Sequence, residues 1–160
     1  MAVYLKLAAL KGNVTDPKHK DWIKIDSIQF GIGRAISSVV GTVANREAST
    51  PSLSEVTLTK QLDASSLPLL KMSLGGTSGE DAVLHFVKVD SDAQDTYMEI
   101  KLSDALVSSY STSATSDMAP SESFSLNFTK ITCTHKTFDN DHKVSGSFSA
   151  GYDMIQAKTL

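Results

Sequence analysis

The feature that most constrains the fold is an alternation of apolar and polar residues with a period of two. Val56 and Leu58 alternate with polar neighbours, and Met98, Ile100 and Leu102 do the same further along the chain. This spacing places apolar side chains on one face of a strand and polar ones on the other. We therefore predict a mainly β protein whose strands bury one face.

The same alternation shifts its phase early in the chain. Ile23 and Ile25 set one register and Ile28 sets the other, which predicts a β-bulge near Asp26 and Ser27.

Length and composition limit the function classes. The chain has 160 residues, 41% of them hydrophobic and 21% charged, with a net charge of -3. This length predicts a single domain over residues 1–160. The net charge argues against nucleic-acid binding, because phosphate neutralisation needs a basic excess. No apolar stretch approaches the length of a membrane span, so we expect no membrane insertion.

One helix and one long loop interrupt the expected strands. We predict a short helix at about residues 66–74, with Ser65 or Ser66 capping its first turn and Gly75 and Gly76 ending it in the left-handed conformation. Its leucines at helical spacing, Leu67 among them, are expected to face the protein. Residues 34–52 show little regular pattern, and a loop of this length in a compact protein indicates a functional role.

Several separated motifs occur in one order along the chain. They are Asp16-Pro-Lys-His-Lys-Asp-Trp22, Phe30-Gly-Ile-Gly-Arg34, Thr59-Lys-Gln-Leu-Asp-Ala-Ser-Ser66, Leu106-Val-Ser-Ser109 and Ser125-Leu-Asn-Phe128. With these motifs the chain resembles the haemolysin-coregulated protein (Hcp) family, the tube subunit of bacterial type VI secretion systems.

The resemblance implies both a fold and a function. The fold is a compact β-barrel of two packed antiparallel sheets with one flanking helix. The function is that of a structural subunit, which forms hexameric rings that stack into a tube and carries effector proteins in the lumen. The implied partners are copies of itself, the contractile sheath, the spike protein and effector cargo. The subunit would be made in the cytoplasm of a Gram-negative bacterium without a signal peptide and secreted by the type VI route.

Two sets of positions follow from this resemblance and from the long loop. The family-motif positions are Asp16, His19, Lys20, Trp22, Gly31, Asp63, Ser65 and Ser66. Our candidates for ring contacts and stacking are Arg34, Ile36, Val39, Val40, Val43, Arg46 and Glu47, because apolar residues are unfavourable in an isolated solvent loop.

Catalytic and metal-binding patterns were sought, and we assign no catalytic, cofactor or metal residue. His19 lies between two lysines, which oppose a cation, so we interpret it as part of a solvated turn. His85 lies in an apolar strand and is expected to be a neutral core or interface histidine. Cys133, the only cysteine, is interpreted as a small apolar strand residue.

Two other functions remain open from the sequence. A monomeric β-sandwich that binds carbohydrate or protein would share the alternation and the lack of catalytic residues. A serine hydrolase using Ser149 is a further alternative, although the segment lacks the strand-turn-helix context of a nucleophile elbow. Size-exclusion chromatography separates a monomer from a hexamer.

Overall fold

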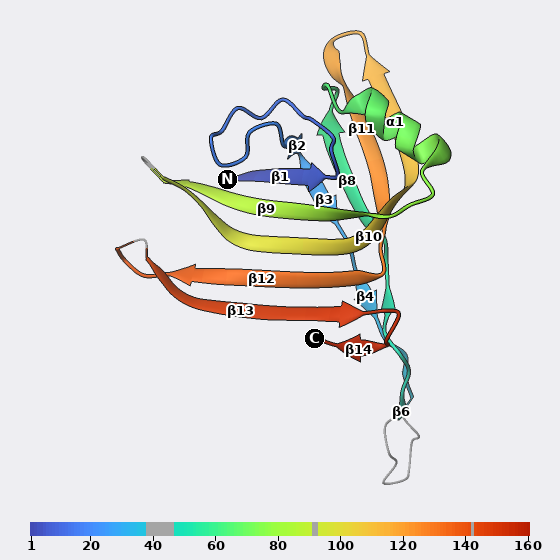
Figure 1. Cartoon of the computed structure of the whole chain (residues 1–160), viewed down its shortest axis with the longest axis vertical. Coiled ribbons are helices and arrows are strands. Elements are labelled where there is room, and N and C mark those ends of the chain that lie inside the picture. Colours follow the sequence, from blue (N-terminus) through green and yellow to red (C-terminus); the bar gives the residue numbers. More distant parts are fainter. Residues whose placement is uncertain (38–46, 91–92, 142) are drawn as a thin grey trace.

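The fold consists of two antiparallel β-sheets, one helix and a projecting two-stranded arm (Figure 1). The structure is a computed structural model, and it describes residues 1–37, 47–90, 93–141 and 143–160. Sheet A contains, in spatial order, β2 (Ile23–Ile25), β1 (Ala2–Leu7), β9 (Glu80–Asp90), the first part of β10 (Ala93–Thr115), β12 (Lys130–Phe138), β13 (Val144–Asp153) and β14 (Lys158–Thr159). Sheet B contains the second part of β10, then β11 (Met118–Asn127), β8 (Val56–Gln61) and β3 (Ser27–Gln29).

Strand β10 belongs to both sheets. Its residues up to Ala105 pair with β9, and its residues from Leu106 onward pair with β11. The change occurs beside Asp104, whose φ of 55° lies in the left-handed region and which falls in a register shift against β9. A bulge of this kind turns a strand from one sheet into another.

The second connection between the sheets lies at Asp26. β2 ends at Ile25 in sheet A and β3 begins at Ser27 in sheet B, and the backbone N–H of Asp26 donates to the carbonyl of Thr59 at 2.8 Å. The register shift that predicted a bulge is therefore a sheet-to-sheet corner. Strand pairing leads from β2 through β1, β9, β10, β11 and β8 to β3, which follows β2 directly in the chain. The predicted fold of two packed antiparallel sheets is confirmed.

The core lies between the two sheets and is mainly apolar, but it also contains a buried ion pair. Leu5, Leu84, Ile100 and Phe124 are fully buried. Lys60 and Glu122 are also buried on this side, because Lys60 follows Val56 and Leu58 at the period of two. An alternation argument that skips charged residues misses this position.

Helix α1 (Ser66–Gly75) confirms the predicted helix, but the details of its ends differ. The Ser65 side chain makes no capping bond; instead an Asp63 carboxylate oxygen accepts the Ser65 N–H at 2.8 Å. Gly76 at the other end is extended, with φ -71°. Glycine is required there because a Cβ would lie 2.7 Å from the carbonyl oxygen of Met72. The left-handed ending was wrong.

The buried face of α1 also differs from the expectation. Leu69 is fully buried, whereas Leu67 and Leu74 are 76% and 79% exposed. Of the three leucines at helical spacing, Leu67 and Leu74 therefore face solvent and only Leu70 is half-buried.

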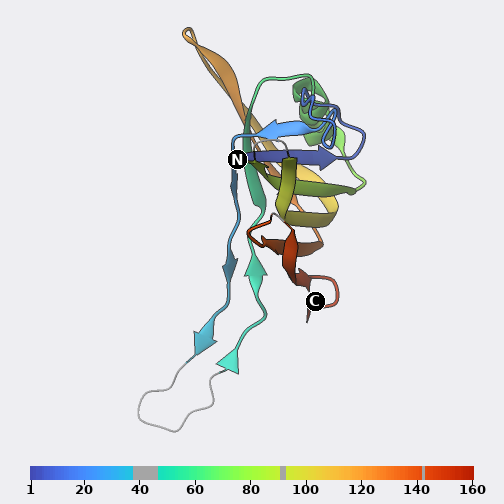
Figure 2. The ribbon, with the colours of Figure 1, turned by 90° about the vertical axis from the view of Figure 1, so that its left-hand side faces the viewer.

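The arm continues the β3–β8 strand pair away from the two sheets (Figure 2). β4 (Ile32–Gly33) pairs with β7 (Ser52–Leu53), and β5 (Ile36–Ser37) pairs with β6 (Glu47–Ala48). The expected long loop is thus a projecting ribbon along its described flanks.

No helix in the described ranges is both long and apolar enough to cross a bilayer.

Candidate assembly surface

The apolar, core-facing side of sheet A extends beyond the area that sheet B covers. One transverse row runs through Leu102 and Ile131, which are buried. The next runs through Ile100, which is fully buried, to Cys133 and Ala150, which are half-buried and exposed.

The third row reaches solvent. It runs through Met98 and His135 to Phe148, which is 66% exposed. Val144, near the start of β13, is 56% exposed. We call the region that comprises Cys133, His135, Phe148 and Ala150 the shelf. An apolar patch continuous with a core is typical of a protein–protein contact.

A groove separates the base of the arm from the same two strands. Its volume is about 330 Å³. Its lining carries no charged side chain and consists of Phe30, Ile32, Pro51, Leu53, Ile131, Cys133, Ala150, Gly151 and Tyr152. The groove and the shelf share Cys133 and Ala150, so they form one continuous apolar surface.

Cys133 contributes a thiol group to this apolar surface. Burial raises the pKa of its thiol above the ordinary value, so the thiol stays protonated at neutral pH and is a poor nucleophile. Its interpretation as a small apolar strand residue agrees with this position.

The outward face of sheet B has the opposite character. Strand pairing aligns hydroxyl and amide side chains across it, and no charged residue occupies these positions, which are Ser27, Gln29, Thr57, Thr59, Gln61, Ser109, Ser111, Ser113, Ser121, Ser123 and Ser125. Neighbours bond to one another, as in the pairs Ser27–Thr59 at 2.5 Å and Thr57–Ser125 at 3.1 Å between side-chain oxygens. We call it the hydroxyl face.

The motif positions at the helix start are structural. The Ser66 hydroxyl accepts from the N–H of Asp63 and from Lys60 Nζ, both at 3.0 Å, and donates to Glu122 Oε2 at 2.8 Å. Lys60 Nζ also contacts Asp63 Oδ1 at 2.8 Å. This network joins α1 to β8 and β11. The sequence indicated the burial of Lys60 only through its spacing of two residues from the apolar positions before it.

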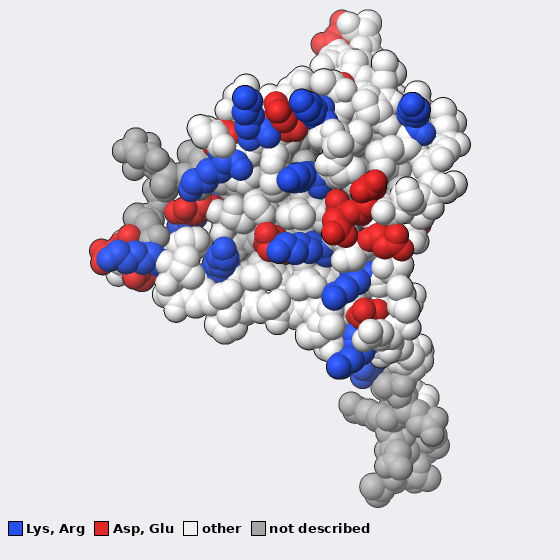
Figure 3. Space-filling view, viewed as in Figure 1, with Lys and Arg blue, Asp and Glu red and all other residues white. Residues whose placement is uncertain are grey.

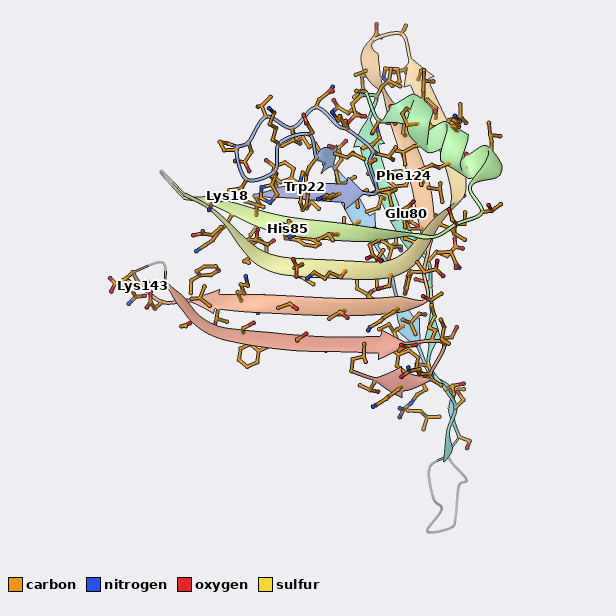
Figure 4. All side chains as sticks on the ribbon, viewed as in Figure 1. Lys18, Trp22, Glu80, His85, Phe124 and Lys143 are labelled. Atoms are coloured by element: carbon orange, nitrogen blue, oxygen red, sulfur yellow. The ribbon has the colours of Figure 1, made fainter. Side chains whose placement is uncertain are left out.

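His19 corrects our interpretation of a solvated turn, because the residue is only 2% exposed. Its ring lies between those of Tyr4 and Trp22, each with its centroid 4.9 Å away. His19 Nε2 contacts His85 Nδ1 at 2.9 Å. Figure 4 shows Trp22 and His85 beside each other next to β1 and β9. Residues 11–22, which we call the flap, thus cover the outer face of sheet A.

His85 is half-buried, as a core or interface histidine would be. Burial lowers the pKa of its ring, an effect that the hydrogen bond to Glu99 partly offsets and the neighbouring His19 strengthens. The ring is therefore harder to protonate than an ordinary histidine.

The remaining candidate positions are spread along the arm and the flap. Arg34 and Ile36 are exposed on the arm, Ile36 by 55%. Gly31 forms the base of the arm, where its N–H donates to Ser54 Oγ at 2.7 Å. Lys20 is exposed on the flap.

The other stacking candidates are not placed. Val39, Val40, Val43 and Arg46 lie outside the described residues, and for Glu47 the structure gives only the strand pairing with Ser37.

Catalytic chemistry has little support in the described part of the chain. The Ser149 hydroxyl lies 3.3 Å from the Thr134 hydroxyl, which cannot act as its general base. Within the described ranges, no three histidine, cysteine or acidic side chains are placed to hold a metal ion.

Charges on the face shown in Figure 3 are mixed. Basic and acidic side chains alternate across it, without a broad patch of one sign. Such a surface does not provide the continuous basic strip that nucleic acid requires.

Comparison with known proteins identifies relatives. The family described as "Type VI secretion system effector, Hcp" matches residues 4–135. A solved structure described as that of a type six secretion system protein is 25% identical, with a TM-score of 0.91 and 99% of both chains covered. Hcp1 from Salmonella typhimurium is 22% identical, with a TM-score of 0.80 over 99% of this chain and 98% of that one. A type VI secretion system effector from Yersinia pestis is 21% identical, with a TM-score of 0.75 over 94% and 98%.

A search of curated proteins gave no match of comparable significance. The family match spans most of the chain, and the fold matches solved members over nearly its whole length. The chain therefore belongs to the Hcp family of type VI secretion systems.

Proposed function

We propose that this chain is the subunit of a type VI secretion tube, and that its copies associate side by side into hexameric rings through the shelf and the groove. The observation that carries this proposal is Phe148, a large apolar side chain that is 66% exposed on the same sheet face as the core. Covering that face removes apolar surface from water, which stabilises an assembly by roughly 25 cal/mol per Å² buried.

A ring requires that the shelf of one subunit contacts a different surface of its neighbour. The shelf lies on one side of each subunit, so a head-to-tail contact leaves the same surface available to the next copy. Repetition of such a contact closes a ring, whereas a two-fold contact ends at a dimer. A persistent contact of this kind buries roughly 800 Å² per partner.

The hydroxyl face is our candidate for the lumen lining. Its side chains are uncharged and polar, and two pairs of them are bonded to each other, so it presents neither a strong electrostatic attraction nor an adhesive apolar patch. Such a lining suits effector proteins of varied charge that must be released after delivery.

The arm is our candidate for ring-to-ring stacking. Ile32 and Ile36 are exposed on it, and it projects away from both sheets (Figure 2). The sheath, the spike protein and export by the type VI route complete the proposed context. We propose no catalytic role and no cofactor.

Sedimentation velocity and negative-stain electron microscopy test the ring. The unmodified protein is expected to sediment as a hexamer and to appear as rings. Phe148→Lys is expected to shift it to monomer while leaving its circular dichroism spectrum unchanged. Gln29→Lys, which adds the same charge on the exposed hydroxyl face, should keep the rings.

The outcome also decides between the two main functions. A monomer at every concentration would support the stand-alone binding module instead. Rings that survive Phe148→Lys would show that a different surface makes the contact.

A further inference from the structure

Four side chains form a continuous chain of hydrogen bonds between the flap and sheet A. Asp16 Oδ2 contacts His19 Nδ1 at 2.5 Å, His19 Nε2 contacts His85 Nδ1 at 2.9 Å, and His85 Nε2 contacts Glu99 Oε2 at 2.9 Å. Asp16 and His19 come from the flap, His85 from β9 and Glu99 from β10. All four ring nitrogens are therefore engaged.

The number of protons in this chain decides whether all three bonds can form. Each hydrogen bond needs one proton, so the chain needs three. Two neutral histidines beside two ionised carboxylates carry only two N–H protons. When both N–H groups donate to the carboxylates, no proton remains between the two rings. Two bare nitrogen lone pairs would then face each other across 2.9 Å. With four protons, two N–H groups would face each other instead.

We propose that the flap is a latch held closed by one proton shared between His19 and His85, and that a further proton, taken up on acidification, releases it. The two rings act as one unit, because a proton on either of the two facing nitrogens determines whether the other can accept a hydrogen bond. The latch is therefore closed within a pH window, and it opens on both sides of that window.

The surrounding charges fit a chain that carries three protons. Two carboxylates and one shared proton give it a net charge of -1. Lys101 Nζ lies 3.2 Å from Glu99 Oε1 and balances this charge at the β10 end. Lys18 Nζ on the flap lies 3.7 Å from Asp95, Thr96 Oγ1 lies 3.5 Å from His85 Nδ1, and Tyr4 packs on the His19 ring.

The direction of the acid response follows from His85. Burial lowers the pKa of its ring below the ordinary value of 6.5, so protonation is easier when the flap is open and the ring is solvated. On the acid side of the window, the latch is lost as the pH falls below about 6.5 toward the pKa of His85 in the closed state.

Opening the flap would uncover an apolar surface. Trp22 packs on His85 with ring centroids 4.7 Å apart. Val87, which pairs with Ala2 on this face, is fully buried. Acid release would therefore expose Trp22 and Val87 on the outer face of sheet A, while the core between the two sheets stays closed.

Trp22 is the only tryptophan, so its fluorescence reports on the flap directly. We expect its emission to shift to longer wavelength between pH 7.5 and 5.0, with a midpoint below 6.5, while the far-ultraviolet circular dichroism stays constant. Amide hydrogen exchange gives a second readout. The N–H groups of Val14 and Asp21, which bond to Trp22 O and Val14 O, should exchange at least about tenfold faster at pH 5.0 after correction for intrinsic rates.

His85→Gln is the decisive variant. A glutamine can accept from His19 Nε2–H through its oxygen and donate to Glu99 through its nitrogen, so the chain stays satisfied when His19 is charged. The transition below pH 6.5 should disappear, and the flap should stay closed down to pH 5.0. Lys136→Gln, which introduces the same side chain at an exposed position of β12 outside the shelf, is the control and should keep the midpoint of the unmodified protein.

Three results would overturn the proposal. The first is constant Trp22 emission from pH 7.5 to 5.0. The second is a change of emission without faster amide exchange, because it indicates quenching by an imidazolium in a closed flap. The third is an unchanged midpoint in a folded His85→Gln protein. If His85→Gln does not fold, a nitrogen-15 imidazole spectrum of the unmodified protein at pH 7 decides, since the latch requires a proton signal shared by both rings.

Discussion

Lys60 and Glu122 form an ion pair inside the core, with 2.6 Å between Nζ and Oε2 and no exposure of either side chain. Asp63 and Ser66 share the same ammonium group, and the Tyr110 hydroxyl donates to Glu122 Oε1 at 2.6 Å. The strand β8, the strand β11 and the start of α1 are therefore held by one buried polar network.

Removing the cation from this network should be strongly destabilising. Lys60→Met leaves Glu122 as a buried carboxylate without its partner, so we expect a loss of about 3 to 5 kcal/mol in the free energy of unfolding. Urea denaturation measures it. Lys24→Met, at an exposed position on β2, should be near neutral. The double variant Lys60→Met, Glu122→Leu should lose less than Lys60→Met alone, and a loss equal to or greater than the single would contradict this account.

Gly12 is the residue where the start of the flap passes closest to its end. A Cβ at this position would lie 2.3 Å from the Trp22 carbonyl oxygen and 2.6 Å from the Ile23 Cα. Backbone atoms cannot yield as a side chain does, so Gly12→Ala should displace the flap and cost about 1 to 3 kcal/mol. Trp22 emission at pH 7.5 should shift to longer wavelength. Gly33→Ala, where among the described residues no atom beyond its chain neighbours lies within 4 Å of the added carbon, should leave it unchanged.

Cys133 provides a footprint of the proposed ring contact. Its thiol is half-buried in the groove with a raised pKa, so alkylation at pH 7.5 should already be slow in the monomer. In assembled rings it should be slower still, roughly tenfold or more if the neighbour fills the groove, and Phe148→Lys should restore the monomer rate. Labelling measured by mass spectrometry provides the comparison, and equal rates in ring and monomer would place the contact elsewhere.

The arm provides a separate prediction about stacking. Deletion of residues 39–49 should leave the two sheets folded and the rings intact, because the described contacts between the sheets involve none of these residues. Tubes should be lost, since the deletion removes five of the stacking candidates, which are Val39, Val40, Val43, Arg46 and Glu47. Sedimentation of the variant tests this, and undiminished tubes would refute the role of the arm.

The alternation of apolar residues predicted most of the strand faces, although Leu62, which the same alternation places on the buried face with Val56 and Leu58, lies past the end of β8 and is 53% exposed. Val56 and Leu58 in β8, and Ile100 and Leu102 in β10, are buried as expected. The position of the helix was also correct, because its serine-rich start and glycine-rich end are local signals. These features depend on near neighbours in the chain, which a sequence displays directly.

The polar contacts could not be obtained in this way. The environment of His19 depends on His85, which lies 66 residues further along the chain, and two lysines beside a histidine suggest solvent when no partner is known. The burial of Lys60 was readable from its period-two position, but the charge led us to skip it. The corner at Asp26 showed a register shift, yet a bulge and a change of sheet look alike in one dimension.

The direction of the arm has a mechanical consequence. β3 and β8 run on into the arm without changing direction (Figure 2). Tension applied to the arm therefore acts along the strands. Their backbone hydrogen bonds are then loaded together in shear and do not break one after another. A subunit joined to its neighbours in this way would transmit a sudden axial force with little deformation where the arm meets the two sheets.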